Sequence, residues 1–137
     1  MHLGIELEIT ILDFPEWIAR MIQGDFPHVA WSGSSASYVD PMWFLDLFTT
    51  GNGYGTQWAD REYSALVARA KYSSDPEQRT GTLAECEKRL LRAMPVMPMD
   101  HWVTADLIKP YVRGLGSNLL DRKQLKYAWI DTNWRPS

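Results

Sequence analysis

Residues 5–24, IELEITILDFPEWIARMIQG, contain the change of pattern on which our prediction of the fold rests. In 5–11, isoleucine and leucine occupy every second position, with Glu or Thr between them. That is the period of a strand buried on one face. After Pro15 the apolar residues follow helical spacing, and Gly24 is placed to end a helix. A strand that leads directly into a helix is the repeating unit of an α/β fold.

The same alternation continues along the chain. Short apolar runs between turn residues predict further strands at 27–32, 96–102, 103–108 and 125–130. Apolar residues at helical spacing predict further helices after Asp40-Pro41, over 60–72 and from Asp75-Pro76 to Pro95. We therefore predict an α/β fold, a mixed sheet flanked by helices, built as a single domain over 1–137.

Composition and charge exclude several classes of protein. The chain carries 14 Lys and Arg against 17 Asp and Glu, without a basic run, which argues against a nucleic-acid partner. It has no stretch of 18 apolar residues that would span a membrane. The single cysteine, Cys86, excludes an internal disulfide and a multi-cysteine zinc site.

The sequence contains no recognisable catalytic or metal-binding motif. His2, His28 and His101 are scattered, without a His-Glu-x-x-His pattern. The stretch 33–37 resembles a nucleophile elbow but lacks its final glycine, and the glycine-rich loop 51–55 lacks the Walker lysine. We therefore predict a protein that is not an enzyme and that has no catalytic residue, metal or cofactor.

The high aromatic content, 7 Trp and 6 Tyr, fits a packed core, a ligand site or an interface. Trp31 ends a predicted strand and is followed by small residues, by Tyr38 and by the helix start at Asp40-Pro41. A strand end that feeds a loop and a helix N-terminus is a common ligand position in α/β folds. Trp102 stands at a second strand end. Burial of these aromatics in the core is the alternative, and the pattern leaves both open.

An ordered string of short motifs resembles one known family. It comprises Glu16-Trp17 on a helix, a strand ending at Trp31, Tyr38-x-Asp40-Pro41-x-x-Phe44-Leu45, the helix Tyr63 to Ala70, Asp75-Pro76-x-x-Arg79, Glu87-x-x-Leu90, Pro95-Val96-Met97-Pro98 and Leu107-Ile108-Lys109-Pro110-x-Val112-x-Gly114. Over nearly the whole chain this string is similar to the C-terminal part of the oligopeptide- and dipeptide-binding proteins of ABC importers, the family 5 extracellular solute-binding proteins.

Members of that family trap a peptide between two hinged lobes outside the cytoplasmic membrane. The resemblance implies that 1–137 is most of the C-terminal lobe of a type II periplasmic-binding-protein fold, with 125–131 as the closing strand that returns to the other lobe. It implies a peptide or other small solute, the missing N-terminal lobe and an ABC permease as partners. The implied location is periplasmic or extracytoplasmic and membrane-associated, with a signal or anchor outside this chain. We also expect that the isolated lobe can form homo-oligomers.

The resemblance further implies a set of ligand-binding residues. Trp17 matches a tryptophan that lines a side-chain pocket, and Trp102 matches an aromatic near the crossing between the lobes. Peptide-binding members carry, at the position of Ser37, an aspartate that pairs with the peptide ammonium. Serine accepts a hydrogen bond but supplies no charge, so the ligand class stays open to sugars or nickel complexes. Oligopeptide binders often carry a tryptophan at the position of Ser34. Some members carry an arginine at the position of Trp31. The predicted set is Trp17, Trp31, Ser34, Ser37, Tyr38 and Trp102.

Two other functions remain as alternatives. The first is a stand-alone α/β protein-interaction module that uses exposed aromatic residues as hot spots and has no transport role. The second is a small hydrolase, although no base-plus-orienter arrangement follows from the spacing of its candidate residues. Those candidates are Ser34 or Ser37 with His28 or His101.

Overall fold

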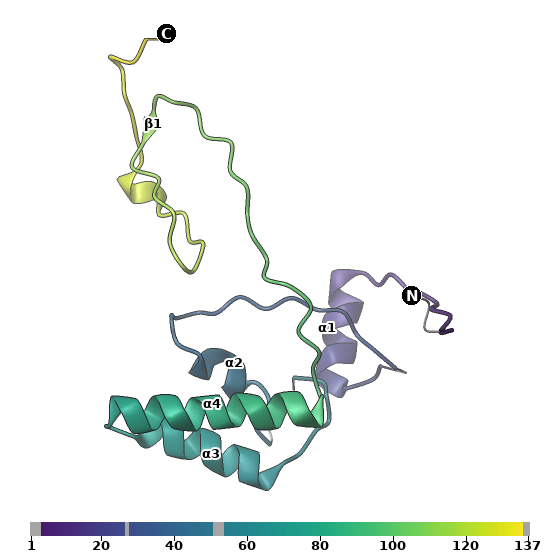
Figure 1. Ribbon diagram of the computed structural model, residues 1–137. Helices are drawn as coiled ribbons and strands as arrows, with labels where there is room; N and C mark the ends of the chain where they lie inside the picture. Colours follow the sequence, from purple (N-terminus) through teal and green to yellow (C-terminus); the bar gives the residue numbers. More distant parts are fainter. Residues whose placement is uncertain (1–3, 27, 51–53, 136–137) are drawn as a thin grey trace.

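The computed structural model describes residues 4–26, 28–50 and 54–135 (Figure 1). No helix in these ranges is both long enough and apolar enough to cross a membrane. The regular elements are helices α1 (Phe14–Gln23), α2 (Met42–Asp46), α3 (Arg61–Tyr72) and α4 (Pro76–Ala93), strand β1 (Val112–Arg113), the 3-10 turn η1 (Leu125–Tyr127) and strand β2 (Trp129–Ile130).

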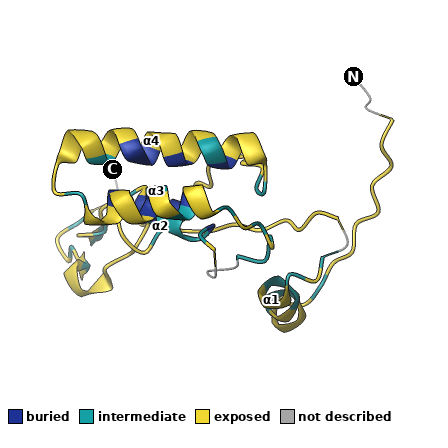
Figure 2. Cartoon of the chain, turned by 90° about the horizontal axis from the view of Figure 1, so that it is seen from below, coloured by how far each residue is buried: buried dark blue, intermediate teal, exposed yellow. Residues whose placement is uncertain are grey.

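The hydrophobic core lies among α2, α3 and α4. Helices α3 and α4 run side by side, and both contain buried residues, which are dark blue in Figure 2. The helices predicted over 60–72 and after Asp75 are therefore confirmed. The buried apolar residues are Met42, Leu45, Phe48, Tyr63, Val67, Ala70, Leu83, Cys86 and Leu90.

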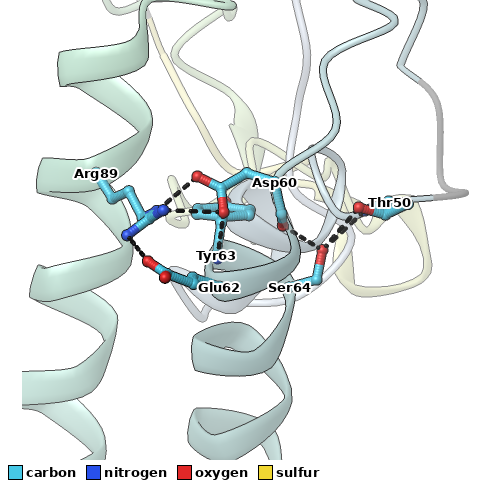
Figure 3. A network of polar contacts seen from close by, with 6 residues as sticks. All are labelled: Thr50, Asp60, Glu62, Tyr63, Ser64 and Arg89. Atoms are coloured by element: carbon cyan, nitrogen blue, oxygen red, sulfur yellow. Dashed lines mark hydrogen bonds and ion pairs between the residues drawn. The ribbon is translucent and has the colours of Figure 1, made fainter.

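A polar network joins the start of α3 to α4 (Figure 3). Asp60 caps α3 by accepting a hydrogen bond from the Tyr63 amide at 2.9 Å. Arg89 of α4 donates from Nε and Nη2 to the Asp60 carboxylate at 2.6 and 3.1 Å, and its Nη1 lies 2.6 Å from the Glu62 carboxylate. The hydrogen bond from Arg89 holds the pKa of Asp60 below its usual range. The network thus fixes the register of the two helices.

The other helix ends follow their sequence signals. Asp13 caps α1 by accepting from the Glu16 amide, and Asp75 caps α4 by accepting from the amides of its first turn. Gly24 ends α1 with φ of 66°, and a Cβ atom at this glycine would collide with the Gln57 side chain. The predicted helix over 15–24 is therefore confirmed.

Helix α2 starts one residue later than the sequence suggested. Pro41 occupies the cap position rather than the first turn, although its backbone is already helical. The Asp40 carboxylate nevertheless makes the capping contact predicted for it, since it accepts from the Met42 amide at 2.8 Å. Arg79 of α4 pairs with Asp40 at 2.9 Å, and this hydrogen-bonded partner lowers the Asp40 pKa. The pair fixes the start of α2 against α4.

The predicted mixed sheet flanked by helices is not formed by the part of the chain that the structure describes. There, β pairing is limited to β1 and β2, which run antiparallel with Val112 opposite Ile130. The segments 5–11, 28–32, 96–102 and 103–108 are irregular, and residue 27 of the predicted 27–32 strand lies outside the described residues. A strand requires a hydrogen-bonded neighbour, which an alternating pattern does not supply. Accordingly the apolar face of 5–11 is exposed, with its isoleucines and leucine 71% to 92% accessible.

The C-terminal hairpin is stabilised near its ends. Gly114 follows β1 with φ of 81°, and a Cβ atom there would collide with the Tyr127 carbonyl oxygen. After β2, the Asp131 amide donates to the Tyr111 carbonyl at 2.8 Å. Within 125–131 the strand is therefore confined to 129–130, and its return to a second lobe stays a prediction.

Candidate ligand-binding site

The predicted site residues other than Trp17 lie on two irregular segments, 31–38 before α2 and 96–108 after α4. The two segments approach each other at Gly33 and the Trp102 ring. A Cβ atom placed on Gly33 would lie 3.9 Å from that ring, which is ordinary van der Waals contact. Trp31 and Trp102 are 74% and 87% exposed. Aromatic surface is thus available to a ligand beside a backbone segment without bulky side chains.

Tyr38 is held at the end of this segment by an aromatic contact with α2. Its ring meets the Trp43 ring edge-on, with centroids 5.5 Å apart and an interplanar angle of 82°. Tyr38 nevertheless keeps 46% of its surface exposed. The Trp43 indole N–H is buried and has no hydrogen-bond partner among the described residues.

Ser37 is positioned by Arg122, a residue that the sequence patterns did not identify. Arg122 Nη2 donates to the Ser37 carbonyl oxygen at 3.0 Å, across 85 positions of the chain. The Asn118 side chain shapes the loop that carries Arg122, since its oxygen accepts from the Leu120 and Arg122 amides at 3.1 and 3.2 Å. No local sequence signal indicates the distant contact of this loop.

Among the described residues, no contact joins Trp17 or Ser34 to the other predicted site residues. Trp17 is half-buried on α1, where its ring stacks on Phe14 with centroids 6.1 Å apart. Helix α1 is attached instead to the loop before α3, because Gln57 Nε2 donates to the Gly24 carbonyl at 2.9 Å. Ser34 is exposed and takes part in no hydrogen bond within the described ranges.

The segment 31–38 is also linked to the helical core. The Ser32 and Tyr54 hydroxyls lie 3.4 Å apart, and the Tyr54 ring meets the buried Phe48 edge-on at 5.8 Å. The segment is therefore held by Tyr54, by α2 and by the Arg122 loop. These attachments leave its outer surface exposed, as a binding surface requires.

The side chains of the candidate site favour binding through van der Waals contacts and hydrogen bonds. In the described ranges, no hydrogen bond joins Ser34 or Ser37 to His28 or His101. Those ranges also contain no cluster of three or more His, Cys, Asp or Glu residues that could hold a metal ion. The groups that the structure places here are indoles, phenols, hydroxyls, backbone carbonyls and one guanidinium.

Comparison with known proteins identifies relatives, although no protein-family model matches the chain. The chain is 32% identical over 97 residues to the dipeptide-binding protein DppE of Bacillus subtilis, which is 70% of this chain and 18% of that protein. It is 24% identical over 131 residues to the periplasmic oligopeptide-binding protein OppA of Escherichia coli, 94% of this chain and 24% of that protein. With the periplasmic murein peptide-binding protein MppA of E. coli it shares 25% over 120 residues, 85% of this chain and 22% of that protein.

The chain thus spans between 18% and 24% of the length of these relatives. All three are peptide-binding proteins by name, and the matched stretches cover most of the chain. The chain is a region of a protein of the oligopeptide- and dipeptide-binding family, the family 5 extracellular solute-binding proteins.

Proposed function

We propose that this chain is part of the substrate-binding component of an ABC importer and that it contributes, as most of a C-terminal lobe, one wall of the site that captures a peptide or related small solute. The observation that carries the proposal is the approach of Trp102 to Gly33, which brings one exposed indole to the segment that carries the exposed Trp31. The peptide-binding names of the relatives support the same function. Ligand capture here is non-catalytic, and the component works outside the cytoplasmic membrane with a permease.

The proposed ligand is held without an ammonium–carboxylate pair at Ser37. The hydroxyl of this serine carries no charge, and its backbone carbonyl accepts from the Arg122 guanidinium. A positive ligand group at this position would face a like charge and gain no ion pair. Aromatic contacts with Trp31, Tyr38 and Trp102 supply affinity instead, since such side chains commonly dominate binding energy.

The exposed apolar stretches support the two-lobe arrangement. The alternating face of 5–11 and the side chains of Val103 and Leu107, 88% and 104% accessible, have no packing partner within the described part of the chain. In the proposed protein these faces pack against the remaining polypeptide. The same surface also fits the interaction-module alternative, in which a partner protein covers it.

Saturation-transfer NMR with a pool of free and N-acetylated di- and tripeptides tests the proposal. The chain should saturate peptide signals, and Trp102→Ala should weaken the effect strongly, since loss of an aromatic hot spot costs about 2 kcal/mol, or about 30-fold in affinity. Trp134→Ala is the matched control, because Trp134 packs on Tyr111 beyond the hairpin. Absence of saturation for every peptide, or equal effects of the two variants, would contradict the proposal.

A further inference from the structure

An open pocket of about 510 Å³ lies between the segment before α2 and the loop that leads to η1. A smaller pocket of about 230 Å³ borders the same loop and shares Asn118, Arg122 and Gln124 with it. Arg122 therefore belongs to the wall common to both. The larger pocket is lined by Val39, Asn118, Leu119, Leu120, Arg122 and Gln124.

The loop holds Arg122 in place through its own hydrogen bonds. The Asn118 amide nitrogen donates to the Arg122 carbonyl at 2.7 Å, in addition to the two amides that its oxygen receives. The neighbouring carboxylate of Asp121 is occupied elsewhere, because it accepts from Thr104 and pairs with Lys123 at 2.6 Å. That carboxylate therefore does not neutralise Arg122.

The guanidinium of Arg122 has no carboxylate within ion-pair distance among the described residues. Its side chain makes one hydrogen bond there, to the neutral Ser37 carbonyl, and this bond uses Nη2. A guanidinium has five N–H donors, so Nε and Nη1 retain donors for a ligand. A charged group with unused donors at a pocket wall is suited to an anion.

The other residues that line the pocket indicate which kind of anion fits it. Val39 and Leu119 are 65% and 88% exposed and border the pocket with Leu120. Gln124 adds an uncharged amide. A planar guanidinium matches a carboxylate through two parallel hydrogen bonds. A single cation beside aliphatic side chains therefore fits a singly charged anion that carries an apolar group better than it fits a doubly charged phosphate.

We propose that this pocket binds the carboxylate of a solute whose adjoining group is apolar, with Arg122 as the charge partner and Val39, Leu119 and Leu120 as the apolar contact. The inference rests on the proposed function, because Ser37 links the pocket to the segment 31–38 and the carboxylate belongs to the captured solute. It makes the carboxylate, rather than an ammonium, the charged group by which that solute is held.

Titration of the ¹⁵N-labelled chain with N-acetyl-L-leucine and with N-acetyl-L-leucinamide tests this inference. We expect the acid to shift the Arg122 Nε–Hε signal and the amides of 118–124, with at least 10-fold higher affinity than the uncharged amide. Arg122→Gln should remove that preference and Arg122→Lys should restore part of it. Arg92→Gln, an exposed change on α4, should leave it intact.

Equal affinities for acid and amide, or a preference that survives Arg122→Gln, would overturn the inference. The two proposals fail separately. If the peptide pool does not bind but N-acetyl-L-leucine binds through Arg122, the proposed function is wrong and the carboxylate site stands. If peptides bind through Trp102 without any effect of Arg122→Gln, the carboxylate site is wrong and the proposed function stands.

Discussion

The Tyr63 hydroxyl donates a 2.6 Å hydrogen bond to the carbonyl oxygen of Leu45. Tyr63 is wholly buried, and Leu45 lies in the last turn of α2, so this bond joins α2 to α3 inside the core. Burial raises the pKa of the phenol, which therefore stays a proton donor. The short helix before the candidate site is thus fixed to the longer helices by a polar contact as well as by packing.

Removal of this hydroxyl should destabilise the core. Tyr63→Phe removes the shorter of the hydrogen bonds to the Leu45 carbonyl, which still accepts from the Phe48 amide at 3.3 Å. We expect a loss of about 1 kcal/mol in the free energy of unfolding. Tyr72→Phe is the control, because Tyr72 belongs to the same helix and is 84% exposed. Urea unfolding followed by circular dichroism measures both. A Tyr63→Phe variant as stable as the control would mean that the hydrogen bond contributes nothing.

The Asp60–Arg89 pair should make stability depend on pH in the acid range. The hydrogen bond from Arg89 lowers the pKa of Asp60 in the folded protein below its value near 4 in the unfolded chain. Its contribution is therefore present above about pH 4 and is lost as the pH falls through the lowered pKa. Asp60→Asn should reduce the difference in melting temperature between pH 6 and pH 3.

The control for that measurement is Asp100→Asn, since Asp100 is exposed and makes no hydrogen bond or ion pair among the described residues. Its acid dependence should match that of the parent chain. If Asp60→Asn and the parent chain showed the same dependence of melting temperature on pH, the Asp60–Arg89 pair would not stabilise the folded state.

Gly114 should be irreplaceable in the hairpin. Gly114→Ala places a Cβ atom against the Tyr127 carbonyl at φ of 81°. Left-handed backbone costs a residue with a Cβ about 1–2 kcal/mol even without a collision. We expect loss of amide-exchange protection at β1 and β2, with the α3–α4 pair unchanged. Gly116→Ala has open space around its new methyl group and should retain protection. Retained protection in both variants would contradict the geometry.

Cys86 should resist modification while the chain is folded. Its thiol lies in the core at 0% exposure, and desolvation raises its pKa, so little reactive thiolate forms. Ellman's reagent at pH 8 should react slowly with the native chain and fully in 6 M guanidinium chloride. Rapid stoichiometric reaction without denaturant would show that α3 and α4 do not pack as described.

The helices were predictable because their signals are local. Asp13, Asp60 and Asp75 each precede an apolar period of 3.6, and each caps a helix in the structure. The sheet was not predictable in the same way. The alternation in 5–11 indicates a face suited to burial, but the pattern contains no information about the neighbour that would bury it. Only the 129–130 part of the predicted 125–130 strand pairs, with β1.

The candidate site was predictable in part. Trp31 and Trp102 stand out as aromatics at predicted strand ends, and Tyr38 stands before a predicted helix start. The resemblance added Trp17, Ser34 and Ser37. The structure joins Trp102 to Gly33 and Ser37 to Arg122. Both contacts link residues that lie far apart in the sequence, and the periodicity of a single segment cannot predict such contacts. Arg122 was missed for that reason.

The central claim is that Trp31 and Trp102 face the ligand, and their indole N–H signals test it most directly. The seven tryptophans give separate probes in a ¹⁵N-labelled chain. On addition of the peptide pool, we expect the Trp31 and Trp102 signals to shift together in a saturable way, while those of Trp58 and Trp134 remain in place. Signals of Trp31 and Trp102 that stay unmoved while the peptides bind, or that shift no more than Trp134, would contradict the account.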